Sequence, residues 1–241
     1  MDNKLISIGK VAKILGITTT TLRRWDKSGK LKSLRTPTGR RAYLLSEIEK
    51  MSMVSTFSIA SGWLNNEKGV EPLENFYCQT GAVFQIRLIE MEGLLIALPG
   101  FEEKFSLIVA AVGEIGNNSF DHNLGNWRDV PGIFFSYDLD KKEIVLADRG
   151  QGVYKTLKRV KPEIADDKDA LKVAFTEIIS GRAPEERGNG LKFVRKVVAL
   201  ADMELQFQSG KAILNIERKS SELFIKKADN EIKGCLIRIK F

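Results

Sequence analysis

The chain has 241 residues, of which 43% are hydrophobic and 29% charged, and its net charge is +7. This composition is that of an ordinary globular protein, and the longest uninterrupted apolar runs are too short to span a bilayer, so we expect no membrane association. Two cysteines without metal-ligand spacing, one histidine and no signal-peptide layout argue against a disulfide framework, a histidine-built zinc site and export, and favour a cytoplasmic protein.

The positive charge is concentrated at the N-terminus. Residues 1–50 hold twelve Lys or Arg and four Asp or Glu, which gives +8, whereas the remaining 191 residues sum to −1. A basic block of this kind favours a polyanion partner, because it contacts phosphates and releases counterions. A merely soluble basic surface is the alternative interpretation.

Two short helices are predicted within the basic block. An apolar pattern with helical spacing over residues 7–15 indicates the first, which Gly16 ends. Threonine hydroxyls at positions 18–20 can cap a second helix over residues 20–27, which ends at residues 28–29. This arrangement is typical of a helix-turn-helix. The exposed side of the second helix is expected to present donors for phosphates and base edges: Thr20, Thr21, Arg23, Arg24 and Lys27.

A hairpin is predicted next, over residues 34–43, with its turn at residues 37–39. Arg35, Arg40 and Arg41 would lie on this hairpin, where they can reach backbone phosphates or a minor groove. A closing helix is expected from Glu47 onward. The hairpin therefore has the form of a basic wing beside the two helices.

Three strings carry a family resemblance in this region. They are Ile-Gly-Lys-Val-Ala-Lys-Ile-Leu-Gly-Ile from residue 8, Thr-Leu-Arg-Arg-Trp-Asp-Lys-Ser-Gly-Lys-Leu from residue 21, and Arg-Thr-Pro-Thr-Gly-Arg-Arg-Ala-Tyr from residue 35. Together they resemble the MerR-type winged helix-turn-helix, in the version found in excisionases and transposon resolvases. The resemblance implies double-stranded DNA as partner, the second helix in the major groove, and a homodimer on the DNA. A basic helical domain that binds protein is the alternative.

The remainder of the chain is predicted as a linker over residues 51–70 and a second domain over residues 71–241, after a DNA-binding domain over residues 1–50. Helices are expected over 79–98, 102–123 and 189–200, and strands over 132–137, 143–147, 203–208, 212–218 and 235–241. Helices combined with largely antiparallel strands predict an α/β two-layer sandwich, and an α+β class for the whole chain.

One predicted helix carries the most informative motif, Gly-Glu-Ile-Gly-Asn-Asn-Ser-Phe-Asp-His-Asn over residues 113–123. Helical spacing puts Glu114, Asn118 and Asp121 or His122 on one face. A carboxylate can orient or deprotonate water, and a carboxamide oxygen one turn away can bind the hard cation Mg²⁺.

Two glycine motifs follow. Asp148 comes directly after a predicted strand, where its carboxylate can accept the exocyclic amine of adenine, and Gly150 and Gly152 allow a sharp turn behind it. Gly188 and Gly190 precede a helix whose free N–H groups and dipole form an anion site. Either glycine pair alone also fits an ordinary turn.

In this order the three motifs resemble the N, G1 and G2 boxes of the GHKL superfamily, the ATP-binding fold of gyrase, histidine kinases and anti-sigma-factor kinases. The resemblance implies ATP and Mg²⁺ as cofactors. It assigns the general base to Glu114, the magnesium ligand to Asn118, the adenine contact to Asp148, the hinge to Gly150 and Gly152, and phosphate contacts to Gly188 and Gly190. Residues 153–187 would form a lid, with Arg182 or Arg187 as phosphate partners.

The single histidine excludes a conventional autophosphorylating histidine kinase, and we expect His122 to pack or to form hydrogen bonds. The leading hypothesis is a DNA-binding transcriptional or mobile-element regulator whose ATP-binding domain gates DNA or partner binding. The alternatives are an anti-sigma-type serine/threonine kinase or slow ATPase that uses Glu114, and a mobile-element or defence protein whose ATPase domain senses another signal.

Overall fold

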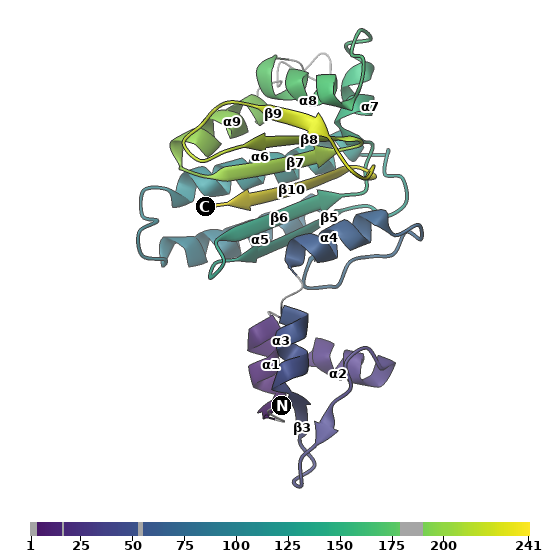
Figure 1. Cartoon of the computed structure of the whole chain (residues 1–241), viewed down its shortest axis with the longest axis vertical. Coiled ribbons are helices and arrows are strands. Elements are labelled where there is room, and N and C mark those ends of the chain that lie inside the picture. The colour runs from purple at the N-terminus through teal and green to yellow at the C-terminus, as the bar shows by residue number, and fades with distance from the viewer. Residues whose placement is uncertain (1–3, 16, 53–54, 179–189) are drawn as a thin grey trace. The chain divides into compact units, whose positions relative to one another are not determined.

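The computed structural model describes residues 4–15, 17–52, 55–178 and 190–241. The chain divides into two compact units, Met1–Ile59 and Ala60–Phe241. Each unit has its own apolar core and combines helices with an antiparallel sheet, which confirms the predicted α+β class (Figure 1).

The N-terminal unit has the expected helix-turn-helix and wing. Its elements are β1 (Leu5–Ser7), α1 (Ile8–Leu15), α2 (Thr19–Ser28), β2 (Leu34–Arg35), β3 (Arg41–Leu44) and α3 (Leu45–Ser52). The hydroxyl of Thr18 caps α2 by accepting from Thr21 N at 3.1 Å, and Gly29, with φ +78°, ends the helix in the left-handed conformation. Strand β1, which the sequence analysis missed, pairs with β3 and gives the sheet order β1-β3-β2.

The second unit is built on a seven-stranded sheet. Its strands are β4 (Tyr77–Cys78), β5 (Ile133–Asp138), β6 (Glu143–Asp148), β7 (Glu204–Ser209), β8 (Ala212–Ile216), β9 (Phe224–Lys227) and β10 (Cys235–Lys240). The order is β4-β5-β6-β10-β7-β8-β9, and every neighbouring pair is antiparallel. The five predicted strands are confirmed, whereas the short strands β4 and β9 were not predicted.

Helices cover one face of this sheet and form the second layer (Figure 1). They are α5 (Gly81–Ile96), α6 (Phe105–Asn123) and α9 (Gly190–Leu200), with α6 packed between the other two. The helices α7 (Gly152–Lys158) and α8 (Asp167–Thr176) lie at the end of the layer. Gly116 of α6 allows α5 to approach closely, because a Cβ there would overlap the Phe84 ring.

A further helix, α4 (Thr56–Asn65), occupies part of the stretch 51–70 that the sequence analysis assigned to a linker. Its side chains Trp63 and Leu64 are buried, and the Trp63 ring lies 6.4 Å from that of Phe134 on β5. Phe134 points away from the helix layer, so α4 covers the opposite face of the sheet. Apolar burial against the sheet is what makes this stretch helical.

Within the described residues, no helix combines the length and the apolar character that a bilayer crossing requires.

Candidate functional site

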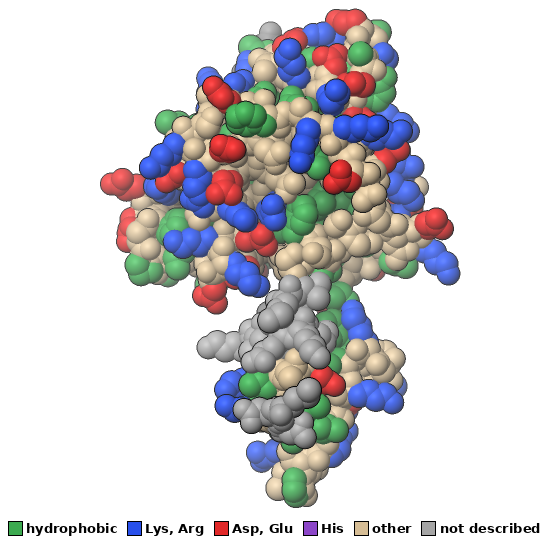
Figure 2. Space-filling view, viewed as in Figure 1, with side chains coloured by type: hydrophobic (Ala, Val, Ile, Leu, Met, Phe, Trp, Pro, Cys, Tyr) green, Lys and Arg blue, Asp and Glu red, His purple; other side chains and the backbone are tan. Residues whose placement is uncertain are grey.

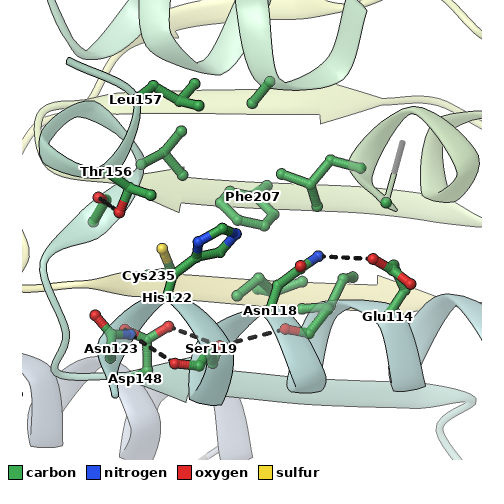
Figure 3. A pocket seen from close by; sticks show the side chains of 17 residues that line it. Glu114, Asn118, Ser119, His122, Asn123, Asp148, Thr156, Leu157, Phe207 and Cys235 are labelled. Carbon is green, nitrogen blue, oxygen red and sulfur yellow. Dashed lines mark hydrogen bonds between the residues drawn. The ribbon is translucent and has the colours of Figure 1, made fainter. Parts of the chain in front are cut away.

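A recess that is open to solvent lies between the helix layer and the sheet (Figure 3). Its walls come from α6, α7, α8 and α9 and from the ends of β6, β7 and β10. The apolar part of the lining includes Ile115, Val153, Leu157, Leu191, Phe207 and Ile237. An apolar lining with a few convergent polar groups is the character of a small-molecule site.

The polar face of α6 forms one wall, with Glu114, Asn118 and His122 at successive turns. Asn118 Nδ2 donates to Glu114 Oε1 at 3.2 Å, so the predicted pair is in direct contact. Asp121, which the spacing also allowed on this face, is exposed and is not part of the lining. The face therefore ends in His122 and not in a carboxylate.

Asp148 lies at the closed end of the recess and is only 2% exposed. Its carboxylate accepts from Ser119 Oγ at 2.9 Å, from Gly150 N at 2.9 Å and from Asn123 Nδ2 at 3.4 Å (Figure 3). Burial raises the pKa of Asp148 from 3.8 to about 6, against the effect of these donors. The Cys235 backbone also donates to this carboxylate, and the group is mostly ionised at pH 7, so it acts as a hydrogen-bond acceptor.

Ser119 and Asn123 were not predicted as site residues. They follow Asn118 on α6 and point toward the end of β6, and only the pairing of these two elements reveals their role. Their spacing of four residues was the one available indication that both lie on one helix face.

Both glycines of the second motif have a structural reason: Gly150 is in close contact with a neighbouring side chain, and Gly152 has a positive φ. A Cβ at Gly150 would overlap the Asn123 side chain. Gly152 has φ +76° and begins α7, and the next N–H, of Val153, donates to Ser209 Oγ at 2.9 Å. Gly234, which was not predicted, has φ +75° and lies against the backbone of Asp148.

Gly190, the first residue of α9, lies against the first motif, because a Cβ there would overlap Glu114 Oε1. The third motif is thus adjacent to Glu114 and Asn118. Gly188, Arg182 and Arg187 lie outside the described residues. The described part of the expected lid contains α7 and α8.

His122 projects into the recess beside Cys235 and Phe207 (Figure 3). Burial, with a smaller contribution from Arg159, lowers the pKa of His122 below its usual 6.5, so the ring is neutral at pH 7. Burial also raises the pKa of the Cys235 thiol. The His122 ring and the Cys235 thiol are therefore both uncharged at neutral pH, and they contribute neutral surface to the recess wall.

Within the described parts of the chain, no three His, Cys, Asp or Glu side chains lie together as a ready-made metal site. A magnesium ion needs fewer protein ligands when it arrives with a phosphate ligand, since it keeps several waters. The Asn118 side-chain oxygen at the recess wall fits that requirement.

Arg149 is a buried charge that the sequence analysis overlooked. It follows Asp148 on the chain but points to the opposite face of the sheet, where it is fully buried. Its guanidinium binds both oxygens of Asp129, with Nε donating to Oδ1 at 2.8 Å. Nη1 donates to the carbonyls of Trp63 and Leu64, at 2.7 and 3.1 Å, and so caps the C-terminus of α4.

Most of the side chains predicted to contact DNA lie on the surface of the N-terminal unit. Lys and Arg side chains outnumber acidic ones on its face in Figure 2. On α2, Thr20, Arg23, Arg24 and Lys27 are exposed. Thr21 is not, since it is 8% exposed and its hydroxyl is bonded to that of Thr18 at 3.0 Å. The prediction that Thr21 lies on the exposed face was therefore wrong, because the capped first turn buries it.

On the wing, Arg35 and Arg40 are exposed, whereas Arg41 is held by Asp26 of α2 at 2.6 Å. A backbone donor from Ser33, followed by Arg41, lowers the pKa of Asp26 to about 2. Arg41 thus joins the wing to α2, and the geometry favours a structural role for it over a phosphate contact.

A comparison with known protein families agrees with the helix-turn-helix predicted for the N-terminal unit. Residues 7–43 match the model of the MerR family regulatory proteins, so this unit carries a MerR-type helix-turn-helix. No curated protein matches the chain significantly. Among solved structures, the 43K ATPase domain of Thermus thermophilus gyrase B, in complex with an aminocoumarin, is similar at 16% identity and a TM-score of 0.34. That match covers 64% of this chain and 40% of the gyrase chain.

Proposed function

We propose that this protein is a transcriptional or mobile-element regulator that binds double-stranded DNA in the cytoplasm, and that its C-terminal unit binds Mg-ATP to gate DNA or partner binding. The observation that carries the nucleotide proposal is the convergence of three distant motifs on one recess, through Glu114, Asp148 and Gly190. The MerR-type match supports DNA as the partner.

The closed end of the recess suits an adenine ring. Asp148 offers a buried, ionised acceptor there, and the exocyclic amine of adenine is a donor. Side chains such as Val153 and Phe207 provide the apolar walls that a purine needs.

The open end suits phosphates. Helix α9 begins at Gly190, and the absent Cβ lets its first turn lie directly beside Glu114 and Asn118. A magnesium ion bound with the nucleotide would neutralise phosphate charge there. Asn118 would hold that ion, and Glu114 would orient a water.

Nucleotide binding is tested by thermal-shift titration of the full chain with ATP and ADP, with and without Mg²⁺. A ligand that binds the native state raises its stability by mass action, by about 2.7 kcal/mol at one hundred times Kd. No shift at millimolar nucleotide would contradict the proposal for the C-terminal unit and leave DNA binding unaffected.

Gating is tested by measuring DNA affinity against salt, with and without Mg-ATP. We expect nucleotide to change the affinity of the wild type, and Asp148→Asn to remove that change. The exposed Asp140→Asn serves as the matched control. Identical DNA affinity of the wild type with and without Mg-ATP would contradict gating.

A second candidate, a serine/threonine kinase of the anti-sigma type or a slow ATPase, is favoured by the position of Glu114 in the recess wall beside the start of α9. Phosphate release or transfer that disappears in Glu114→Ala, while nucleotide still binds, would support it. Neither activity in the purified protein with Mg-ATP would count against it.

A further inference from the structure

Helix α5 is apolar on both of its sides. The inner side packs on α6 and the sheet through Phe84, Leu88, Met91 and Leu95, all buried. The outer side carries Val83, Ile86, Ile89, Leu94 and Ile96, which are between 37% and 64% exposed. Figure 1 shows α5 at the margin of the helix layer, where α6 is its helical neighbour.

The outer face of α5, defined by the exposed residues from 82 to 97, contains almost no polar side chains. Its polar members are Gln85 and Glu90, and the other exposed positions are isoleucine, leucine, valine, alanine or glycine. The charged and partly exposed Arg87 and Glu92 flank this face, and an apolar helix face is normally buried in the working protein. At about 100 Å² for each half-exposed aliphatic side chain, the five large ones expose on the order of 500 Å².

We propose that the outer face of α5 binds the same face of a second copy of this chain, in a two-fold symmetric dimer with antiparallel helices. The spacing supports this arrangement. Ala82, Ile86, Ile89, Gly93 and Ile96 follow one another at intervals of four, three, four and three residues, which is the spacing of a coiled-coil seam.

The seam is complementary to itself when the two-fold axis passes at Ile89. Ile96 then lies level with Ala82 of the second copy, and Ile86 lies one residue from the level of Gly93, so both meet a small residue. A Cβ built at Gly93 finds no atom within 4 Å, which leaves space for the isoleucine. Such isologous pairing is what a two-fold interface requires.

Charge also favours a second copy at this place. Residues 1–50 carry +8 and would repel each other, whereas the remaining residues sum to −1 and allow close approach. Two such faces expose on the order of 1,000 Å² of large aliphatic side chains in total, which is the lower limit for a biological interface. The dimer would bring together two helix-turn-helix units, as two half-sites on DNA require.

This inference goes beyond the proposed function, because self-association is measured without DNA or nucleotide. Sedimentation equilibrium of the full chain between 1 and about 100 µM is expected to show a dimer. Ile89→Glu places two carboxylates face to face on the axis and is expected to weaken the dimer at least about 100-fold. Leu200→Glu, on an equally exposed residue at the end of α9, is expected to leave it unchanged.

Cross-linking gives an independent test. In Ile89→Cys, oxidised glutathione is expected to convert the two introduced thiols of a dimer into one intermolecular disulfide and to be reduced to two glutathione thiols. Leu200→Cys is expected to stay monomeric on a non-reducing gel. The native Cys78 and Cys235 are buried. Circular dichroism melting checks that each variant is folded.

Two results would overturn the proposal. One is a wild-type monomer at 100 µM, which would mean that the chain's own N-terminal unit or a different protein covers the face. The other is a dimer that Ile89→Glu leaves intact and Ile89→Cys does not cross-link.

Discussion

The backbone of Gly190 lies directly against the Glu114 carboxylate, with no space between them for a side-chain carbon. Residues 76 positions apart thus meet at the start of α9 and the middle of α6. This contact determines which motif residues can act on the same ligand, because it joins the expected phosphate site to the expected water-handling pair.

Gly190→Ala is expected to reduce nucleotide affinity at least about tenfold and to destabilise the fold by about 1–3 kcal/mol, since the added methyl overlaps Glu114. Gly62→Ala in α4 is the control. Its Cβ finds no atom within 4 Å, so it is expected to stabilise the helix by about 0.5–1 kcal/mol. Calorimetric titration and urea unfolding measure both effects.

Asp148→Asn is expected to weaken adenine nucleotide binding about 10–100-fold, because a hydrogen bond to a charged group is replaced by a neutral one. The loss should be smaller for a nucleotide whose base lacks the exocyclic amine. Fluorescence or calorimetric titration with ATP and inosine triphosphate distinguishes the two. Equal losses for both bases would contradict an adenine contact at Asp148.

Ionisation of Asp148 is expected to lower stability as the pH rises. Its pKa in the folded state is about 6, above the ordinary 3.8, so the native state binds more protons between these values. The free energy of unfolding therefore falls through this window, by about 3 kcal/mol for a shift of about two units. Asp148→Asn should lack this component. Urea unfolding should therefore show the free energy of unfolding of the variant, minus that of the wild type, rising from about pH 4 to about pH 6 and then staying constant.

The Arg149–Asp129 pair is expected to be a large contributor to stability. Arg149→Ala removes the ion-pair partner of Asp129 and one donor from each of two carbonyls of α4, at a cost of about 3–5 kcal/mol. Arg218→Ala breaks the exposed pair with Glu204 and should cost less than about 1 kcal/mol. Urea unfolding of both variants gives the comparison, and similar small losses would show that Arg149 is dispensable.

Arg23→Ala and Lys27→Ala are each expected to weaken DNA binding and to reduce the salt slope by about one, since each side chain is exposed on α2 and can reach a phosphate. Lys226→Ala, an exposed cation of the second unit, is the control. Arg41→Ala should instead lower the melting temperature, because it frees Asp26.

Much of the fold could be predicted because its elements follow from local pattern. Short apolar runs and turn chemistry located the hairpins β5–β6 and β7–β8 to within about two residues. The strands β4 and β9 are shorter, two and four residues, and have no period to detect. Helix α4 is apolar without a sustained period, and its burial against β5 was not visible in the sequence.

The candidate site was only partly predictable for a related reason. Glu114, Asn118, Asp148 and Gly190 stand in motifs, and the structure brings them to one recess. Their supporting residues depend on contacts between elements. Asn123, for example, bonds Asp148 and restricts position 150 to glycine, which no local pattern indicates. Thr21 and Arg41 were expected to be free donors for DNA. In the structure their side chains form hydrogen bonds within the N-terminal unit instead, with Thr18 and Asp26.

The cation–π contact between Arg149 and Trp63 makes tryptophan fluorescence a suitable signal for ligand binding. The guanidinium carbon lies 5.8 Å from the Trp63 ring, and Arg149 is joined by one peptide bond to Asp148. The indole thus lies on the dry side of the sheet while Asp148 faces the recess. The Trp63 emission spectrum should respond when a ligand occupies the recess, and it can be recorded alone once Trp25 and Trp127 are replaced by phenylalanine.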